Sequence, residues 1–166
     1  MKRPVVVMLA TLCMSGIVEA ADKPAPAIVS ISRLSMDMAI KLAKASIDAC
    51  RKENVNVAVT VVDRGGHPQV VLRDTLAKDL ALPISRQKAY TALSFNTATS
   101  QLEGRFPGNY SVPKLDSVIV AAGGLPITGG GSIIGGVGVS GAPSGVTDEK
   151  CAQAGIDAIK FELETF

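Results

Sequence analysis

Apolar side chains recur at alternating steps of four and three residues near the start of the chain. The set is Met36, Ile40, Ala43, Ile47 and Cys50. This spacing places the set on one face of a helix, so we predict a helix from Met36 to Lys52 with Cys50 on its apolar face. Ser35 is the expected N-cap, and basic residues at the other end suit a helix C-terminus.

The same spacing returns at the end of the chain. The apolar positions there are Ala152, Ile156, Ile159, Leu163 and Phe166. They predict a terminal helix, with Thr147 as its N-cap and Asp148 and Glu149 near its positive end.

Between these helices, short β-branched runs predict strands. Residues 57–63 and 69–73 flank the turn Arg64-Gly-Gly-His67, which indicates a β-hairpin and favours an antiparallel sheet. Gly129-Gly-Gly131 predicts a second turn, between residues 126–128 and a strand over 133–140. Residues 117–122 are a further strand candidate.

Two more helices are expected in the middle of the chain. Pro83 suits the first position of a helix that continues over residues 84–95. A short helix is expected to start near Thr99 or Ser100. The elements show no regular βαβ alternation, so we predict an α+β fold with one antiparallel sheet covered by helices.

Glycines gather in one part of the chain: ten of the 16 lie between Gly123 and Gly145. Apolar β-branched residues interrupt them, so the segment does not read as a disordered linker. Glycine inside a strand marks a bulge or the close approach of another backbone or a ligand. Nucleotide-binding patterns are absent, because these glycines form neither Gly-x-Gly-x-x-Gly nor a P-loop.

The first 20 residues have the layout of a secretory signal peptide. Lys2 and Arg3 precede an uncharged, mostly apolar run of 14 residues, which is too short to span a bilayer as a helix. Small residues then precede an expected cleavage site after Ala20. We predict a signal peptide over 1–20, a flexible lead-in over 21–33 and one domain over 34–166. The mature protein would be exported to the periplasm or the medium, with no membrane attachment.

Composition narrows the chemistry. Lys and Arg are scattered along the chain, which argues against a nucleic-acid partner. The chain has a single histidine, His67, so a His-rich zinc site is excluded. Cys50 and Cys151 would remain after signal removal. An oxidising compartment permits a disulfide between them, and the alternative is two separate buried thiols.

His67 is the most distinctive candidate for ligand chemistry. Its imidazole could hold a metal or a haem iron, and the alternative is an exposed turn residue. Arg86 and Tyr90 are four residues apart on one predicted helix, so they share a face. A cation beside a phenol could receive a carboxylate, such as a haem propionate or a small organic acid. The alternative for this pair is a solvated helix face.

Several motifs in order resemble the GlcG/HbpS-like haem-binding family, which includes the C-terminal domain of PduO-type corrinoid adenosyltransferases. The resemblance covers about residues 36 to 163. The matching segments are Val-Thr-Val-Val-Asp63-Arg-Gly-Gly-His67, Arg86-Gln-Lys88-Ala-Tyr90-Thr-Ala92, Phe95 to Ser100, Ala122-Gly-Gly-Leu-Pro126-Ile127, Ile134-Gly-Gly-Val-Gly-Val-Ser140-Gly141 and Asp148-Glu-Lys-Cys-Ala152-Gln-Ala-Gly155.

The resemblance implies a profilin-like fold with a five-stranded antiparallel sheet flanked by helices. It implies a homo-oligomer, often an octamer, and haem as the cofactor. Lys88 and Tyr90 match the family's second-helix motif. Thr99 occupies a motif threonine that could contact haem from the oxygen side, and His67 is the candidate iron ligand.

We therefore expect an exported haem-binding protein that sequesters haem or helps to degrade it. This reading favours a binding protein over an enzyme. The alternative is an enzyme or metabolic accessory protein that binds a small organic acid or a corrinoid-type cofactor through Arg86, Lys88 and Tyr90. A third class is a structural oligomer that uses no ligand pocket.

Overall fold

The fold is that of a computed structural model, which describes residues 26–106 and 112–165. The expected signal peptide and the first part of the lead-in lie outside the described residues. Four strands form one antiparallel sheet in the order β2-β1-β4-β3. The strands are β1 (Ala58–Asp63), β2 (Pro68–Arg73), β3 (Gly124–Gly129) and β4 (Ser132–Ser140).

The α+β class, the predicted β-hairpin and the predicted turn at Gly129–Gly131 are therefore confirmed, but the expectation of five strands is wrong for the described residues. The strand candidate at 117–122 is irregular backbone. Two of its N–H groups bond side chains instead of a neighbouring strand. Ile119 N donates to Thr91 Oγ1 at 3.0 Å, and Ala122 N donates to Glu103 Oε1 at 2.8 Å. These bonds take the place of sheet pairing.

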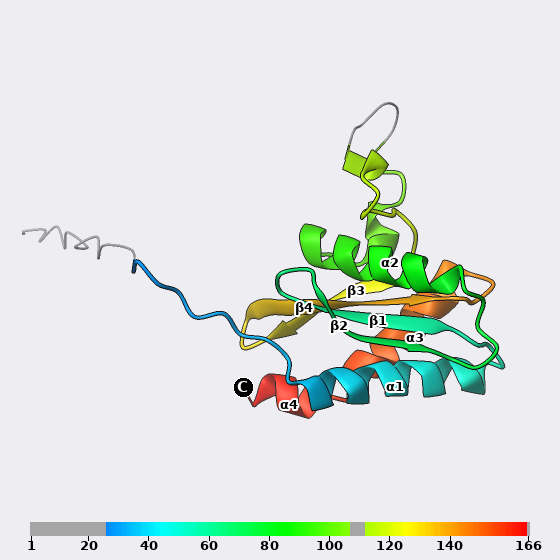
Figure 1. The fold of residues 1–166 in the computed structure, drawn as a ribbon, viewed down its shortest axis with the longest axis horizontal. Helices are drawn as coiled ribbons and strands as arrows, with labels where there is room; N and C mark the ends of the chain where they lie inside the picture. The colour runs from blue at the N-terminus through cyan, green and yellow to red at the C-terminus, as the bar shows by residue number, and fades with distance from the viewer. Residues whose placement is uncertain (1–25, 107–111, 166) are drawn as a thin grey trace, which may run out of the picture.

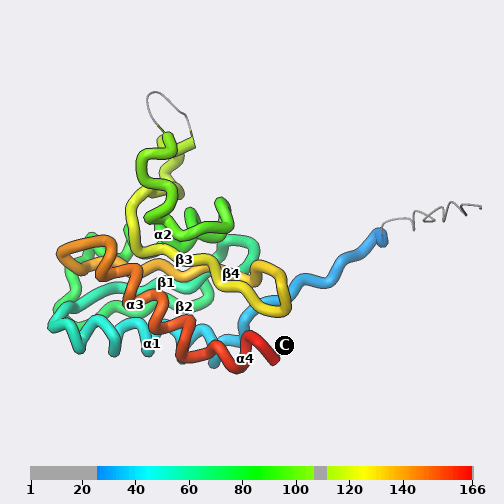
Figure 2. Tube along the Cα trace, turned by 180° about the vertical axis from the view of Figure 1, so that it is seen from behind, coloured from blue at the N-terminus to red at the C-terminus, as the bar shows by residue number. Residues whose placement is uncertain are grey.

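Helices cover both faces of the sheet (Figure 1). The helix α2 (Ala81–Phe95) packs on one face, mainly against β4, β1 and β3. On the other face lie α1 (Met36–Lys52), α3 (Gly145–Asp157) and the short α4 (Lys160–Glu164), as the view from behind also shows (Figure 2). Two short 3₁₀ helices, Thr99–Leu102 and Val112–Lys114, belong to the connection from α2 to β3.

The first helix has the predicted bounds and the predicted cap, since Ser35 Oγ accepts a hydrogen bond from Met38 N at 3.3 Å. Its buried face keeps Ala43, Ile47 and Cys50 of the predicted set but not the first two positions. Met36 is 64% exposed and Ile40 is 40% exposed, whereas Leu42 is fully buried. Ala39 and Ser46 are buried as well, so small side chains make up much of the face that α1 packs against the rest of the fold.

The terminal helix begins earlier than predicted and is interrupted. Ser144, not Thr147, is the N-cap of α3, and its hydroxyl accepts a hydrogen bond from Thr147 N at 3.2 Å. The helix ends at Asp157, and α4 follows after a break at Ala158 and Ile159. The second helix also begins earlier, at Ala81 instead of Pro83.

Glycines in β4 allow α2 to lie close to the sheet. A Cβ on Gly136 would stand 2.5 Å from the carbonyl oxygen of Ala89, and a Cβ on Gly138 would overlap the carbonyl oxygen of Ser85. The sequence left open whether a bulge, a backbone or a ligand accounts for these glycines, and the structure shows the close approach of a backbone, that of α2.

A disulfide joins Cys50 of α1 to Cys151 of α3, with 5.5 Å between the two Cα atoms. Both cysteines are buried. The bond connects the two longer helices on one face of the sheet and leaves α2, on the other face, without a covalent tie.

Candidate ligand-binding site

The turn between β1 and β2 is organised by the carboxylate of Asp63. Its Oδ1 accepts hydrogen bonds from Gly65 N at 2.8 Å and from His67 N at 3.1 Å. Its Oδ2 lies 3.3 Å from Arg33 Nη1. The backbone also closes the turn, since Gly66 N donates to the Asp63 carbonyl at 2.9 Å. This network fixes the position from which the His67 side chain projects.

The side chain of His67 is 81% exposed, so the alternative of an exposed turn residue describes its position correctly. Its Nδ1 lies 3.5 Å from Asp63 Oδ1. The carboxylate therefore stands beside one ring nitrogen, and Nε2 is the nitrogen left for an external ligand.

The structure brings His67, Arg86 and Tyr90 to one cavity of about 590 Å³. This volume is within the roughly 300–1,000 Å³ that is typical of small-molecule pockets. The other lining residues are Gly65, Gly66, Pro83, Gln87, Asp116 and Ser117. The cavity lies where the β1–β2 turn meets the outer side of α2.

Tyr90 forms its contact with the turn through Gly66. A Cβ on Gly66 would stand 2.7 Å from Tyr90 Cε2, and Gly66 has a φ of +81°. Glycine is required there for both reasons: the backbone is in the left-handed region, and the phenol ring occupies the space of a side chain.

Electrostatics favour a charged Asp63 in this turn. Burial alone would raise the pKa of its carboxyl group. The backbone N–H groups of His67 and Gly65, with the positive charge of Arg33, outweigh burial and hold the pKa below its ordinary value. The carboxylate therefore remains ionised and available as a partner for the imidazole.

Lys88 is separated from Arg86 and Tyr90, which corrects the expectation that the three form one face. Lys88 is 4% exposed. Its Nζ donates to Asp148 Oδ2 at 2.8 Å and to the Val139 carbonyl at 3.0 Å. Burial raises the pKa of the Asp148 carboxyl, although its hydrogen bond with Lys88 opposes that shift. The pair connects α2 on one face of the sheet with α3 on the other.

Thr99 also lies away from the cavity of His67. It is fully buried, and its Oγ1 accepts a hydrogen bond from Gly124 N at 2.8 Å. In this position it holds the start of β3, and its hydroxyl has no exposed surface to offer to a ligand.

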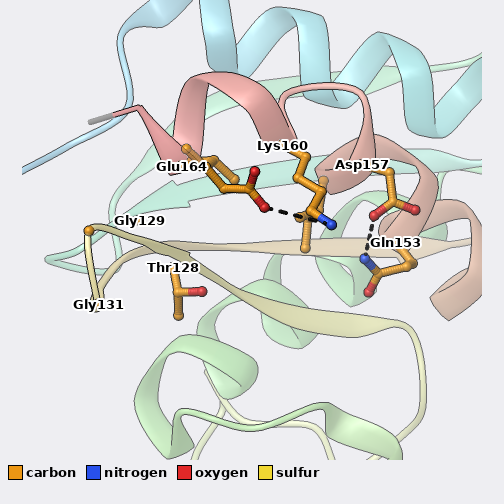
Figure 3. Close-up of a pocket in the computed structure, with 10 residues that line it drawn as sticks. Thr128, Gly129, Gly131, Gln153, Asp157, Lys160 and Glu164 are labelled. Atoms are coloured by element: carbon orange, nitrogen blue, oxygen red, sulfur yellow. Dashed lines mark hydrogen bonds and ion pairs between the residues drawn. The ribbon is translucent and has the colours of Figure 1, made fainter.

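Another hollow, of about 500 Å³, lies between the β3–β4 turn and the helices α3 and α4 (Figure 3). Its polar side chains pair with one another. Lys160 Nζ lies 3.7 Å from Glu164 Oε1, and Gln153 Nε2 donates to Asp157 Oδ1 at 2.9 Å. None of the ligand-binding candidates His67, Arg86, Lys88, Tyr90 and Thr99 lines this hollow.

Two further residues of the His67 cavity, Pro83 and Gln87, could have been found from the sequence. With Arg86 and Tyr90 they follow the i, i+3, i+4, i+7 pattern of one helix face. Asp116 and Ser117 carry no such signal. They reach the cavity because Gln87 Nε2 donates to the carbonyl oxygen of Asp116 at 2.6 Å.

Two types of feature are absent from the part of the chain that the structure describes. It contains no cluster of three or more His, Cys, Asp or Glu side chains arranged to hold a metal ion. Within the same residues, no helix has the length and apolar character needed to cross a membrane.

Comparison with known proteins gives a consistent family. Protein GlcG of Escherichia coli K12 is 34% identical over 111 residues, which cover 64% of this chain and 81% of GlcG. The corrinoid adenosyltransferase PduO of Salmonella typhimurium is 31% identical over 124 residues. These cover 72% of this chain but only 37% of PduO, so the match spans about a third of that protein.

Solved structures agree with these sequences. The crystal structure of HbpS has a TM-score of 0.77 and 35% identity, covering 80% of this chain and 94% of HbpS. The crystal structure of a PduOC–haem complex has a TM-score of 0.70 and 30% identity, covering 77% of this chain and 96% of PduOC. Residues 34–157 match the family described as "Haem degrading protein HbpS-like". With a matching fold and matching sequence over most of its length, the chain belongs to this HbpS-like haem-degrading family, related to GlcG and the PduO C-terminal domain.

Proposed function

We propose that this protein binds haem in the cavity of His67, Arg86 and Tyr90. The observation that carries the proposal is that these three side chains, from two separate sequence motifs, line one cavity. The solved PduOC–haem complex, 30% identical to this chain, supports haem as the ligand class.

The residues present fit the chemistry of haem. The imidazole of His67 is a common iron ligand, and Asp63 beside Nδ1 is the type of partner that orients a ligating histidine. Arg86 offers a guanidinium group, which suits the carboxylate of a propionate. The ring of Tyr90 and the side chain of Pro83 supply apolar surface at the same cavity.

Each residue then has a separate task. His67 Nε2 would hold the iron, Asp63 would keep the imidazole oriented, and Arg86 would fix the propionate edge. Haem bound here would supply a redox-active iron. Lys88 and Thr99 have structural roles in this proposal, because both side chains are buried. Lys88 is bonded to Asp148, and Thr99 is bonded to the backbone of Gly124.

We also propose that the protein is exported to the periplasm or the medium as a homo-oligomer. The amino-terminal sequence pattern supports export. The disulfide between Cys50 and Cys151 is compatible with an oxidising compartment. Light scattering of the purified protein measures the number of subunits, and the amino-terminal sequence of the secreted protein tests cleavage after Ala20.

A spectroscopic titration tests haem binding. Haemin is added to the purified protein, and the Soret band is followed to saturation. We expect a shifted band with a defined stoichiometry. Cobalamin and glycolate, added separately as competitors, represent the corrinoid and organic-acid alternatives, and neither is expected to displace haem. A titration without saturable shift contradicts the proposal.

A further inference from the structure

A second cavity, of about 390 Å³, lies on a different face of α2, where β4 leads into α3. It shares no lining residue with the cavity of His67. Apolar side chains, most of them alanines, form much of its wall. They are Ala81, Ile84, Ile119, Ala121, Ala122 and Ala142.

A buried ion pair, Lys88 and Asp148, also lines this cavity. The side chains are 5% and 4% exposed. Asp148 is satisfied, because Oδ2 accepts from Lys88 Nζ at 2.8 Å and Oδ1 accepts from Ala142 N at 3.0 Å. Lys78 and Glu103 also line the cavity, so its charged side chains are two cations and two anions, and the site has no formal net charge to offer to an ionic ligand.

The ammonium of Lys88 retains one donor. It carries three N–H groups. Two are used, by Asp148 Oδ2 and by the Val139 carbonyl oxygen at 3.0 Å. The described residues provide no third acceptor. Gly123 lets the backbone pack closely against the ammonium, because a Cβ there would stand 2.7 Å from Lys88 Nζ.

We propose that this cavity binds a short uncharged carbonyl compound, such as an aliphatic ketone, aldehyde or amide. Its oxygen accepts the third N–H of Lys88, and its alkyl part packs against the alanine and isoleucine side chains. A carboxylate of the same size is disfavoured, because it would add an uncompensated negative charge to a cavity whose own charged side chains already balance. This site is independent of the haem proposal, since the two cavities use different residues.

Methyl NMR of the full chain tests the proposal, with 2-pentanone as the probe and pentanoate as its charged counterpart. We expect 2-pentanone to shift the methyl signals of Ile84, Ile119 and Ala122 in a saturable way. Pentanoate should bind at least tenfold more weakly. Shifts confined to other residues, no saturable shift, or equal or tighter binding of pentanoate would overturn the proposal.

Variants separate the bond to Lys88 from the shape of the cavity. Lys88→Met should weaken 2-pentanone binding at least tenfold, whereas Lys160→Met, a lysine in the hollow of Figure 3, should leave it unchanged. Lys88→Met also removes the partner of a buried carboxylate. Ala121→Leu therefore provides a second variant, which keeps the ion pair and fills the cavity. Undiminished binding of 2-pentanone by Ala121→Leu also contradicts the proposal.

Discussion

The ring of Tyr90 lies where a side chain of Gly66 would be: a Cβ on Gly66 would stand 2.7 Å from Tyr90 Cε2 and 2.8 Å from Cδ2. Gly66 is in the turn that carries His67, and Tyr90 is on α2. The two walls of the proposed haem cavity are therefore held against each other by this contact. A change at Gly66 must move the turn, the ring or both.

Gly66→Ala should destabilise the protein by about 2–4 kcal/mol, measured by urea unfolding. A left-handed backbone alone accounts for roughly 1–2 kcal/mol in a residue with a Cβ, and the clash with Tyr90 adds to it. Gly131→Ala is the matched control. Gly131 has a φ of +76°, but nothing lies within 4 Å of its Cβ position. Equal destabilisation in the two variants would show that the contact with Tyr90 is unimportant.

His67→Ala should weaken haem binding by about 10–100-fold and change the Soret spectrum, because the imidazole is the proposed iron ligand. Its side chain is 81% exposed. Exposed positions usually change stability by less than about 0.5 kcal/mol, so the spectrum would not change through unfolding. Urea unfolding of the variant provides that control. An unchanged spectrum would exclude the imidazole as ligand.

Arg86→Gln should weaken haem binding by about tenfold, because a charge-assisted bond to a propionate contributes roughly 1.5–3 kcal/mol when it is well formed. The same variant should bind haem dimethyl ester as the unchanged protein does, since the ester has no carboxylate. Arg105→Gln, at an exposed arginine outside the cavity, is the control for general charge effects. An equal loss with haem and with the ester would mean that Arg86 does not contact a propionate.

Lys88→Met should destabilise the protein by about 3–5 kcal/mol, because it leaves Asp148 buried without its partner. Combining it with Asp148→Asn should restore part of that loss, and the double variant should be more stable than the sum of the single changes predicts. Urea unfolding of the four proteins gives the coupling free energy. Strict additivity would contradict a direct interaction between the two side chains.

Stability should fall on the acid side as Asp63 becomes protonated. Its folded pKa lies below the ordinary value of 3.8, so its contribution is present above about pH 4 and is lost as the pH falls through the lower folded pKa. Asp63→Asn should lack this contribution. We expect the difference in unfolding free energy between the unchanged protein and Asp63→Asn to be constant above pH 5, where Asp63 is fully ionised. The difference should shrink towards pH 2, as Asp63 becomes protonated. A difference that grows as the pH falls would contradict a lowered pKa of Asp63 in the folded protein.

Much of the fold could be predicted from sequence periodicity. The bounds of the first helix, the hairpin of β1 and β2 and the turn between β3 and β4 follow from local patterns. The failed strand at 117–122 shows the limit of such patterns. Its β-branched residues are typical of a strand. Two of its N–H groups, however, donate to the side chains of Thr91 and Glu103, which are distant in sequence.

The candidate site was likewise predictable only in part. The face shared by Arg86 and Tyr90 follows from helix geometry. The buried position of Lys88 does not, because a lysine between these two residues is expected in solvent unless a buried partner is known. That partner, Asp148, is 60 residues later and on the other side of the sheet. Sequence periodicity along one helix gives no information about such a pair.

The bond between Cys50 and Cys151 also has a topological consequence. The two cysteines are 101 positions apart, and all four strands and α2 lie between them. The protein is therefore a covalent ring with two tails: α1 and the lead-in on one side, the rest of α3 and α4 on the other. A single backbone cut anywhere inside the ring leaves one connected molecule, and its fragments separate on a gel only after a reducing agent is added.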